Sequence, residues 1–130
     1  MDFIEVVELF TRIDAAIDQS EPMRALRLID LNFSRLPDPA PLRERTARIL
    51  AGNDHTDRAI ELFGRVGRHY ANAGHPTRAM VVAKQIDRLA GDPSDLVDHL
   101  VALYNVRSPL LDRQQSHATF DPPDEEPFVL

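Results

Sequence analysis

The chain has 130 residues, of which 43% are hydrophobic and 28% charged, so it is long enough for one globular domain with a core and too short for two. No stretch approaches the roughly 18 consecutive apolar residues of a membrane span, and the absence of cysteine excludes disulfides, thiolate nucleophiles and cysteine-based zinc sites. The first residues are acidic and apolar, unlike a basic secretory leader, so we expect a cytoplasmic protein with no membrane insertion.

The net charge of −6 is concentrated near the C-terminal end of the chain. Residues 114–130 contain four acidic residues and no Lys or Arg, which leaves −2 (−6 minus −4) for residues 1–113. A nearly neutral folded part argues against a surface for nucleic acid or anionic lipid. We therefore expect no nucleic-acid partner.

Three segments in the first half of the chain have the apolar spacing of a helix with one buried face, and they cover residues 2–19, 22–36 and 41–52. The apolar stripe of the first segment consists of Phe3, Val6, Val7, Phe10, Ile13 and Ile17. The stripe of the second consists of Ala25, Leu28, Ile29, Phe33 and Leu36.

Three further segments repeat this spacing over residues 55–73, 76–90 and 94–106. The first of them carries Ala59, Leu62, Phe63, Val66 and Tyr70, and the last carries Leu96, Leu100, Leu103 and Tyr104. No segment alternates with the period of two that is typical of a half-buried strand. The sequence therefore predicts an all-α protein with about six helices.

Glycine, proline and aspartate mark the limits of these segments. Gly52, Gly74 and Gly91 follow periodic runs, where a left-handed C-cap residue is expected. Prolines stand in the first turns of four segments, at positions 22, 41, 76 and 93, and Asp54 and Asp92 are placed to act as N-caps. The loops are therefore short, which predicts that consecutive helices are antiparallel neighbours.

An arginine–alanine pair followed by an apolar residue opens three segments, and two of its alanines, Ala25 and Ala59, are 34 residues apart. Farther along, the spacing of aromatic, small and turn residues resembles the tetratricopeptide repeat (TPR) consensus, and bacterial TPR signalling and adaptor proteins in particular, at Phe63, Val66, Gly67, Tyr70, Gly74 and Ala79. Gly67 and Ala79 are expected where two helices cross closely.

The resemblance implies antiparallel helical hairpins, arranged as a right-handed superhelix or as a compact bundle. Two registers remain open: the 34-residue spacing makes the fourth helix the second of a hairpin, whereas the match at Tyr70, Gly74 and Ala79 makes it the first. We expect the helical domain to cover residues 1–110. Residues 111–130 are acidic and rich in proline, so we expect them to be disordered.

No group of residues is typical of an active site. The five histidines include no His-Glu-x-x-His, and no serine lies in Gly-x-Ser-x-Gly. Gly64 and Gly67 fall inside a helical segment with no preceding strand, so close packing explains them better than a phosphate loop. We expect no catalytic, cofactor-binding or metal-binding residues.

In TPR proteins the inner face of the first helix of each hairpin lines a groove. The two registers together place five polar residues on such a face, and these are the predicted partner-binding residues: Glu44, Arg48, Glu61, Arg68 and Asn72. An ordinary solvated surface is the alternative. The apolar end, Phe128-Val129-Leu130, resembles a short linear motif, with a simple disordered end as its alternative.

The leading functional hypothesis is a non-catalytic adaptor or scaffold that binds another protein or peptide. The alternative is a self-associating regulatory subunit, or a segment of a larger bacterial signalling, motility or secretion complex. A homodimer would use the last helix, whose apolar side has no following helix to cover it, through Leu100, Leu103 and Tyr104.

Overall fold

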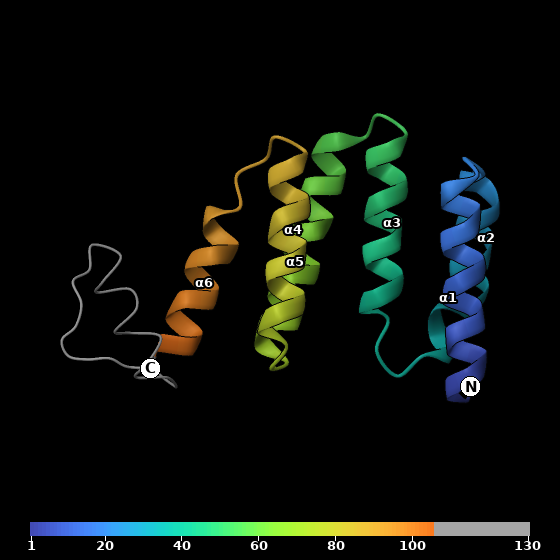
Figure 1. The fold of residues 1–130 in the computed structure, drawn as a ribbon, viewed down its shortest axis with the longest axis horizontal. Helices are drawn as coiled ribbons and strands as arrows, with labels where there is room; N and C mark the ends of the chain where they lie inside the picture. The colour runs from blue at the N-terminus through green and yellow to red at the C-terminus, as the bar shows by residue number, and fades with distance from the viewer. Residues whose placement is uncertain (106–130) are drawn as a thin grey trace.

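The structure, a computed structural model, describes residues 1–105, and every regular element in that part of the chain is helical. In chain order the elements are α1 (Phe3–Asp18), α2 (Pro22–Asn32), the short 3₁₀ helix η1 (Phe33–Arg35), α3 (Ala40–Gly52), α4 (Thr56–Asn72), α5 (Pro76–Arg88) and α6 (Ser94–Asn105). The helices stand side by side, from α1 and α2 at one end of the row to α6 at the other (Figure 1). The predicted all-α class with six helices is confirmed, and none of the helices over residues 1–105 has the length and apolar character to cross a membrane.

Local sequence signals explain where the helices begin. The Asp2 carboxylate accepts the backbone N–H of Glu5 at 2.8 Å, and the Glu5 carboxylate accepts that of Asp2 at 2.9 Å, so a reciprocal capping box starts α1. Helices α2 and α5 begin at Pro22 and Pro76, where a residue without an N–H costs no hydrogen bond.

An aspartate–proline pair precedes both α3 and α6. The Asp38 carboxylate accepts the backbone N–H of Ala40 at 3.0 Å, and the Asp92 carboxylate accepts that of Ser94 at 2.9 Å. Each carboxylate thus bonds a backbone donor in the first turn of a helix. Asp92 was expected at the N-cap position itself, but α6 begins at Ser94, so Asp92 lies one residue before that position.

Four turns between helices share one backbone geometry. Each contains a residue with positive φ, namely Ser20 (57°), Asp54 (66°), Gly74 (88°) and Ala90 (61°). In each turn the next residue donates its N–H to the carbonyl five positions earlier, at 2.8–3.0 Å. This is the hydrogen bond of a Schellman motif, and it satisfies a carbonyl at the end of the preceding helix.

The prediction of glycine at these left-handed positions is correct only for Gly74. Gly52 belongs to α3, and Asp54 adopts the positive φ in place of capping α4, whose N-cap is His55. A Cβ on Gly91 would lie 3.0 Å from methyl carbons of Ile60 and Ile86, so this glycine lets the turn after α5 approach Ile60 of α4 closely. The predictions for Gly52, Gly91 and Asp54 are therefore wrong.

The second helix ends earlier than predicted, at Asn32 instead of residue 36. The Asn32 side-chain amide donates to the carbonyl of Leu28 at 2.8 Å, which gives that carbonyl a partner within the last turn. Helix η1 follows, and Leu36 is extended. The connection from α2 to α3 is consequently longer than the other turns.

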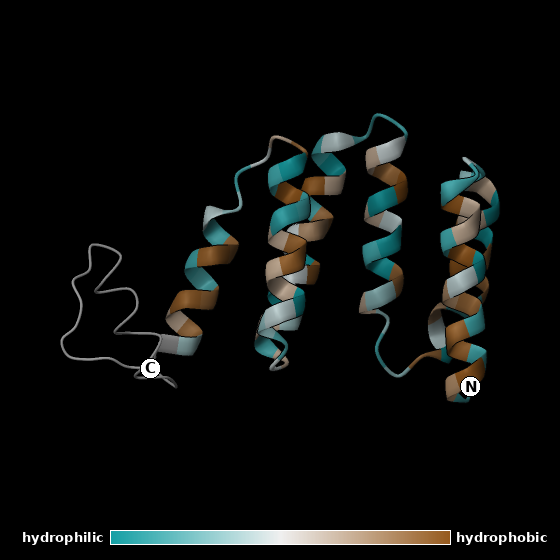
Figure 2. Cartoon of the chain, in the orientation of Figure 1, coloured by the Kyte–Doolittle hydropathy of each residue, from teal (hydrophilic) through white to brown (hydrophobic). Residues whose placement is uncertain are grey.

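The core consists of two clusters that meet on α3. Ala40 and Ala47 of α3 face a cluster with α4, α5 and α6, whose other buried members are Ala59, Phe63, Val66, Tyr70, Ala71, Ala79, Val82, Ala83, Ile86, Leu96 and Leu100. Leu42 and Ile49 of α3 face a cluster with α1 and α2, whose other buried members are Leu9, Ile13, Ala16, Ala25 and Ile29. Figure 2 shows the resulting alternation of apolar and polar residues along each helix.

A glycine allows α4 to contact two later helices at once. A Cβ on Gly67 would lie 2.5 Å from Leu96 Cδ2 of α6 and 3.3 Å from Val82 Cγ1 of α5. Because Gly67 has no side chain, α5 and α6 can both approach α4 closely at this position. With α3 on another side, α4 packs against three helices.

A polar contact accompanies the apolar one between α1 and α3. Two nitrogens of the Arg45 guanidinium donate to the two carboxylate oxygens of Asp14 at 2.8 and 3.1 Å, and Arg48 donates to the same carboxylate at 3.1 Å. The Arg45 guanidinium also lies 4.2 Å from the centre of the Phe10 ring. The α1–α2 hairpin is thus attached to the remaining helices mainly through α3.

Candidate functional site

The exposed face of α4 carries a line of polar side chains. Glu61, Arg65, Arg68 and Asn72 follow one another at spacings of four, three and four residues, which place them on one side of the helix, and all four are exposed. Arg65 donates to Glu61 at 3.0 Å, whereas Arg68 has no ion pair with any residue in the described part of the chain. The structure therefore brings together three of the five predicted partner-binding residues.

A hollow of about 300 Å3 lies next to this line, between α3 and α4. We call it the α3–α4 groove and define it by its lining residues Ala40, Arg43, Leu62, Arg65, Val66 and His69. Its apolar members come from the edge of the core, because Ala40 and Val66 are buried and Leu62 is half-buried. Its other three members are basic side chains, all exposed.

The basic side chains of the groove differ in how far they are neutralised. Arg43 lies over the Phe33 ring at 5.3 Å and has no carboxylate partner within residues 1–105. His69 lies 3.1 Å from a carboxylate oxygen of Asp38, and both side chains are about half exposed. Arg43 is therefore the cation of this groove that is most available to an external carboxylate.

The Asp38 carboxylate at the end of the groove has a lowered pKa. Burial acts to raise this pKa, but the hydrogen bond from the Ala40 backbone, the contact with His69 and the charge of Arg78 lower it by more. Asp38 consequently stays ionised and continues to cap the first turn of α3.

Glu44 faces the protein interior and not the exposed line on α4. It accepts a hydrogen bond at 3.1 Å from the hydroxyl of Tyr70, whose side chain is 1% exposed. Burial first, and the Glu44 charge second, raise the pKa of the Tyr70 phenol far above its ordinary value, although Arg78, 4.6 Å from the ring centre, acts in the opposite direction. The Tyr70 phenol therefore stays protonated and donates a hydrogen bond that has a structural role.

Arg48 and Asn72 also have partners within the chain. Arg48 donates to Asp14 of α1, and the amide oxygen of Asn72 lies 2.8 Å from Nε2 of His99 on α6. Of the five predicted residues, Arg48 and Glu44 are thus engaged away from the α4 line. Glu61, Arg68 and Asn72 remain on it.

The residues predicted to form a homodimer pack inward. Leu100 is 6% exposed and belongs to the core, and the half-buried side chains of Leu103 and Tyr104 pack against it. The Tyr104 hydroxyl donates to the carbonyl of Ala71 on α4 at 3.0 Å. The apolar side of α6, which was expected to be left uncovered, therefore packs against α4 and α5.

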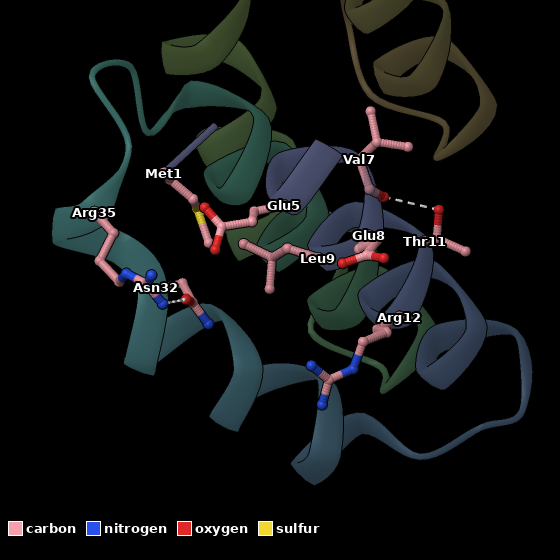
Figure 3. A pocket seen from close by; sticks show the side chains of 9 residues that line it. All are labelled: Met1, Glu5, Val7, Glu8, Leu9, Thr11, Arg12, Asn32 and Arg35. Atoms are coloured by element: carbon pink, nitrogen blue, oxygen red, sulfur yellow. Dashed lines mark hydrogen bonds between the residues drawn. The ribbon is translucent and has the colours of Figure 1, made fainter. Parts of the chain in front are cut away.

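A second and larger hollow, of about 620 Å3, lies beside α1. Figure 3 shows Glu5, Glu8 and Arg12 of α1 on one side and Asn32 and Arg35 on the other. The nearby apolar side chains of the chain start are exposed: Phe3 by 81%, Ile4 by 68% and Val7 by 45%. The sequence periodicity assigned Phe3 and Val7 to a buried stripe, and this assignment is wrong because neither α2 nor α3 covers the start of α1.

The structure assembles no metal site from the residues that it describes, since no group of three or more His, Asp or Glu side chains there has a suitable geometry. The predicted tail motif, Phe128-Val129-Leu130, and the expected domain boundary at residue 110 lie outside these residues.

Three groove residues, Arg43, Arg65 and His69, were not among the predicted site residues. Arg65 was within reach of sequence reasoning, because it follows Glu61 by four residues and precedes Arg68 by three. Arg43 and His69 come together only through the pairing of α3 with α4. No spacing within a single helix signals that pairing.

Comparison of the chain with family models, with curated proteins and with solved structures finds no match.

Proposed function

We propose that this chain is a non-catalytic interaction module that binds a partner protein or peptide along the exposed face of α4 and the adjoining α3–α4 groove. The observation that carries the proposal is the combination of an apolar floor, at Leu62 and Val66, with exposed arginines at its rim. Apolar pockets with a few polar anchors are typical of binding sites.

The arginines suit a partner that presents carboxylates. A guanidinium makes two parallel hydrogen bonds with a carboxylate, and Arg43 and Arg68 have no carboxylate partner among the described residues. An acidic or extended peptide laid along α4 could bond both arginines. Asn72, at the end of the same line, offers an amide for its backbone.

A non-catalytic role is supported by the chemistry of the nearby titratable groups. Tyr70 is buried and keeps its proton, so it is a poor nucleophile and a poor base. Asp38 is ionised and occupied by the Ala40 amide and His69. Each of these groups is already engaged in a contact within the chain, Tyr70 with Glu44 and Asp38 with His69.

We further propose that the packing is TPR-like, with α4 as the first helix of a hairpin and α5 as the second. The close approach of Gly67 to Val82 of α5 and Leu96 of α6 supports this register, because small residues in TPR hairpins lie where helices cross.

The test is quantitative capture by the full chain, immobilised and exposed to lysate of the source cells. We expect at least one protein to be retained by the wild type and lost with Arg68→Glu and with Arg43→Glu. The matched control is Arg27→Glu, which makes the same charge change at an exposed position of α2. If no captured protein distinguishes the control from the Arg43 and Arg68 variants, the proposed surface is wrong.

A second candidate function, self-association as a subunit of a larger assembly such as a signalling, motility or secretion complex, is favoured by the uncovered start of α1. Phe3, Ile4 and Val7 together expose an apolar surface that a monomer in water would rarely leave open. If this surface is used, Ile4→Glu should convert an oligomer into a monomer in sedimentation velocity, and Leu103→Glu on α6 would be expected to disturb folding. A wild-type monomer at high concentration excludes this candidate.

A further inference from the structure

We propose that residues 121–130 of the chain bind in the α3–α4 groove of the same molecule and cover part of the surface that a partner would use. This acidic segment contains four carboxylates followed by three apolar residues, in the order Asp-Pro-Pro-Asp-Glu-Glu-Pro-Phe-Val-Leu. Its effect on a partner rests on the proposed function, whereas the docking itself does not.

Charge complementarity is the first argument. Residues 114–130 contain no Lys or Arg, so the acidic segment has no basic side chains of its own to pair with. The groove has Arg43 without a carboxylate partner among residues 1–105, and Arg65 paired only with the exposed Glu61. Exposed pairs of this kind are weak, so a second carboxylate can join or replace Glu61.

The apolar part of the segment matches the apolar floor of the groove. Leu62 and Val66 line a hollow of about 300 Å3, which is at the lower end of the range for ligand sites. Such a hollow accommodates a few side chains of a peptide that lies along the surface. Phe128, two residues after Glu126 in the sequence, provides an aromatic side chain of this kind.

The chain is long enough to make the contact. Helices α4 and α6 end, and α3 begins, on the same side of the row of helices, at the bottom of Figure 1. Ala40 is the first residue of α3 and His69 is in the last turn of α4, so this part of the groove lies on that side too. Packed helices are about 8–10 Å apart, so the step from α6 across α4 to α3 is roughly 20 Å. Residues 106–120 are fifteen residues, which can span about 50 Å when extended.

Prolines lower the entropic cost of binding the segment. Pro122, Pro123 and Pro127 fix the φ angle at three of its ten positions, and they also favour extended backbone in the residues before them. Fewer conformations are therefore lost on binding than for a flexible segment.

The test uses the full chain with a tryptophan reporter, Phe128→Trp, because the chain contains no other tryptophan. The reference is a free peptide of residues 119–130 with the same substitution. We expect the emission of the full chain to be blue-shifted from that of the peptide and less quenched by acrylamide. Adding Arg43→Glu should abolish both differences, whereas the matched control Arg27→Glu should leave them unchanged, with circular dichroism confirming that every variant folds.

Three results would overturn the inference. Emission equal to that of the free peptide means that the segment is not docked, and a blue shift that survives Arg43→Glu means that it is docked elsewhere. A blue shift that disappears on dilution identifies the groove of a second copy as the site. If the segment is not docked but partner binding still requires Arg68, only the present inference is refuted. If the segment is docked but the chain captures no partner, only the proposed function is refuted.

Discussion

The core cluster of α3–α6 is rich in small residues, with six alanines among its thirteen buried members, whereas the cluster between the α1–α2 hairpin and α3 consists mainly of leucine and isoleucine, with two alanines among seven. Small side chains let helix backbones approach closely, so α4 contacts three other helices at once. The hairpin has no such helix, and its larger side chains, with Leu42 and Ile49, fill the space between it and α3. The difference teaches that local stability should differ along the chain, with the hairpin opening at a lower free energy than α4 and α5.

The largest effect should come from emptying one core or the other. Phe63→Ala, at a site 1% exposed, should lower the free energy of unfolding by about 3–5 kcal/mol and increase hydrogen exchange throughout α3–α6. Ile13→Ala, at a fully buried site in the hairpin, should cost about 2–5 kcal/mol but increase exchange chiefly in α1 and α2. Equal increases in all helices after Ile13→Ala would show a single cooperative unit.

Two glycines of α4 offer a matched pair for the role of small residues. Gly64→Ala meets no atom within 4 Å and should raise the free energy of unfolding by up to about 1 kcal/mol, through helix propensity. Gly67→Ala places a methyl group 2.5 Å from Leu96 Cδ2, and overpacking should cost about 1–3 kcal/mol. Urea unfolding measures both. Stabilisation by both substitutions would remove the argument that α4 needs close contact with α6.

The left-handed turns sharpen the comparison with smaller effects. Ser20 and Ala90 have positive φ without being glycine, at a cost of about 1 kcal/mol each. Ser20→Gly should therefore slow hydrogen exchange in the hairpin, and Ala90→Gly should slow it in α5 and α6. As a control, Gly74→Ala should destabilise by a similar amount, because its φ of 88° suits glycine.

The smallest effect concerns pH at the start of α3. The pKa of Asp38 is lowered in the folded state, so its contribution to stability is present above its ordinary pKa of about 3.9 and disappears as the pH falls through the lower folded value. With an exposed partner, the contribution should be a fraction of 1 kcal/mol. Asp38→Asn keeps an oxygen for the Ala40 amide and should flatten the decrease in melting temperature below pH 4, while Asp30→Asn, exposed on α2, should not.

Helix positions followed from the sequence because apolar spacing, prolines and aspartates act locally. The stripe of Ala59, Phe63 and Val66 is buried as the periodicity predicted, and α2 and α5 begin at the expected prolines. The residues with positive φ could not be predicted from the glycines, because glycine also occurs where close packing requires it, as at Gly91. A pattern within one segment does not distinguish these two needs.

The candidate site was less predictable than the helices. Arg48 was assigned to a groove, but its partner Asp14 lies 34 residues earlier on another helix. Likewise, Arg43 and His69 share a groove only because α3 packs on α4. Such contacts depend on which helices pack against each other. The two repeat registers that the sequence allows pair the helices differently, so the sequence did not determine these contacts.

Because α3 completes both cores, it also sets the order in which the chain can assemble during synthesis. The hairpin leaves the ribosome before Leu42 and Ile49 do, so Leu9, Ile13 and Ile29 at first lack the α3 side chains that cover them in the folded protein. Once α3 has emerged, its other side, at Ala40 and Ala47, stays exposed to solvent until α4 packs against it. The nascent chain therefore exposes an apolar surface from the emergence of its first helices until α4 has emerged, and chaperones would encounter it during this interval.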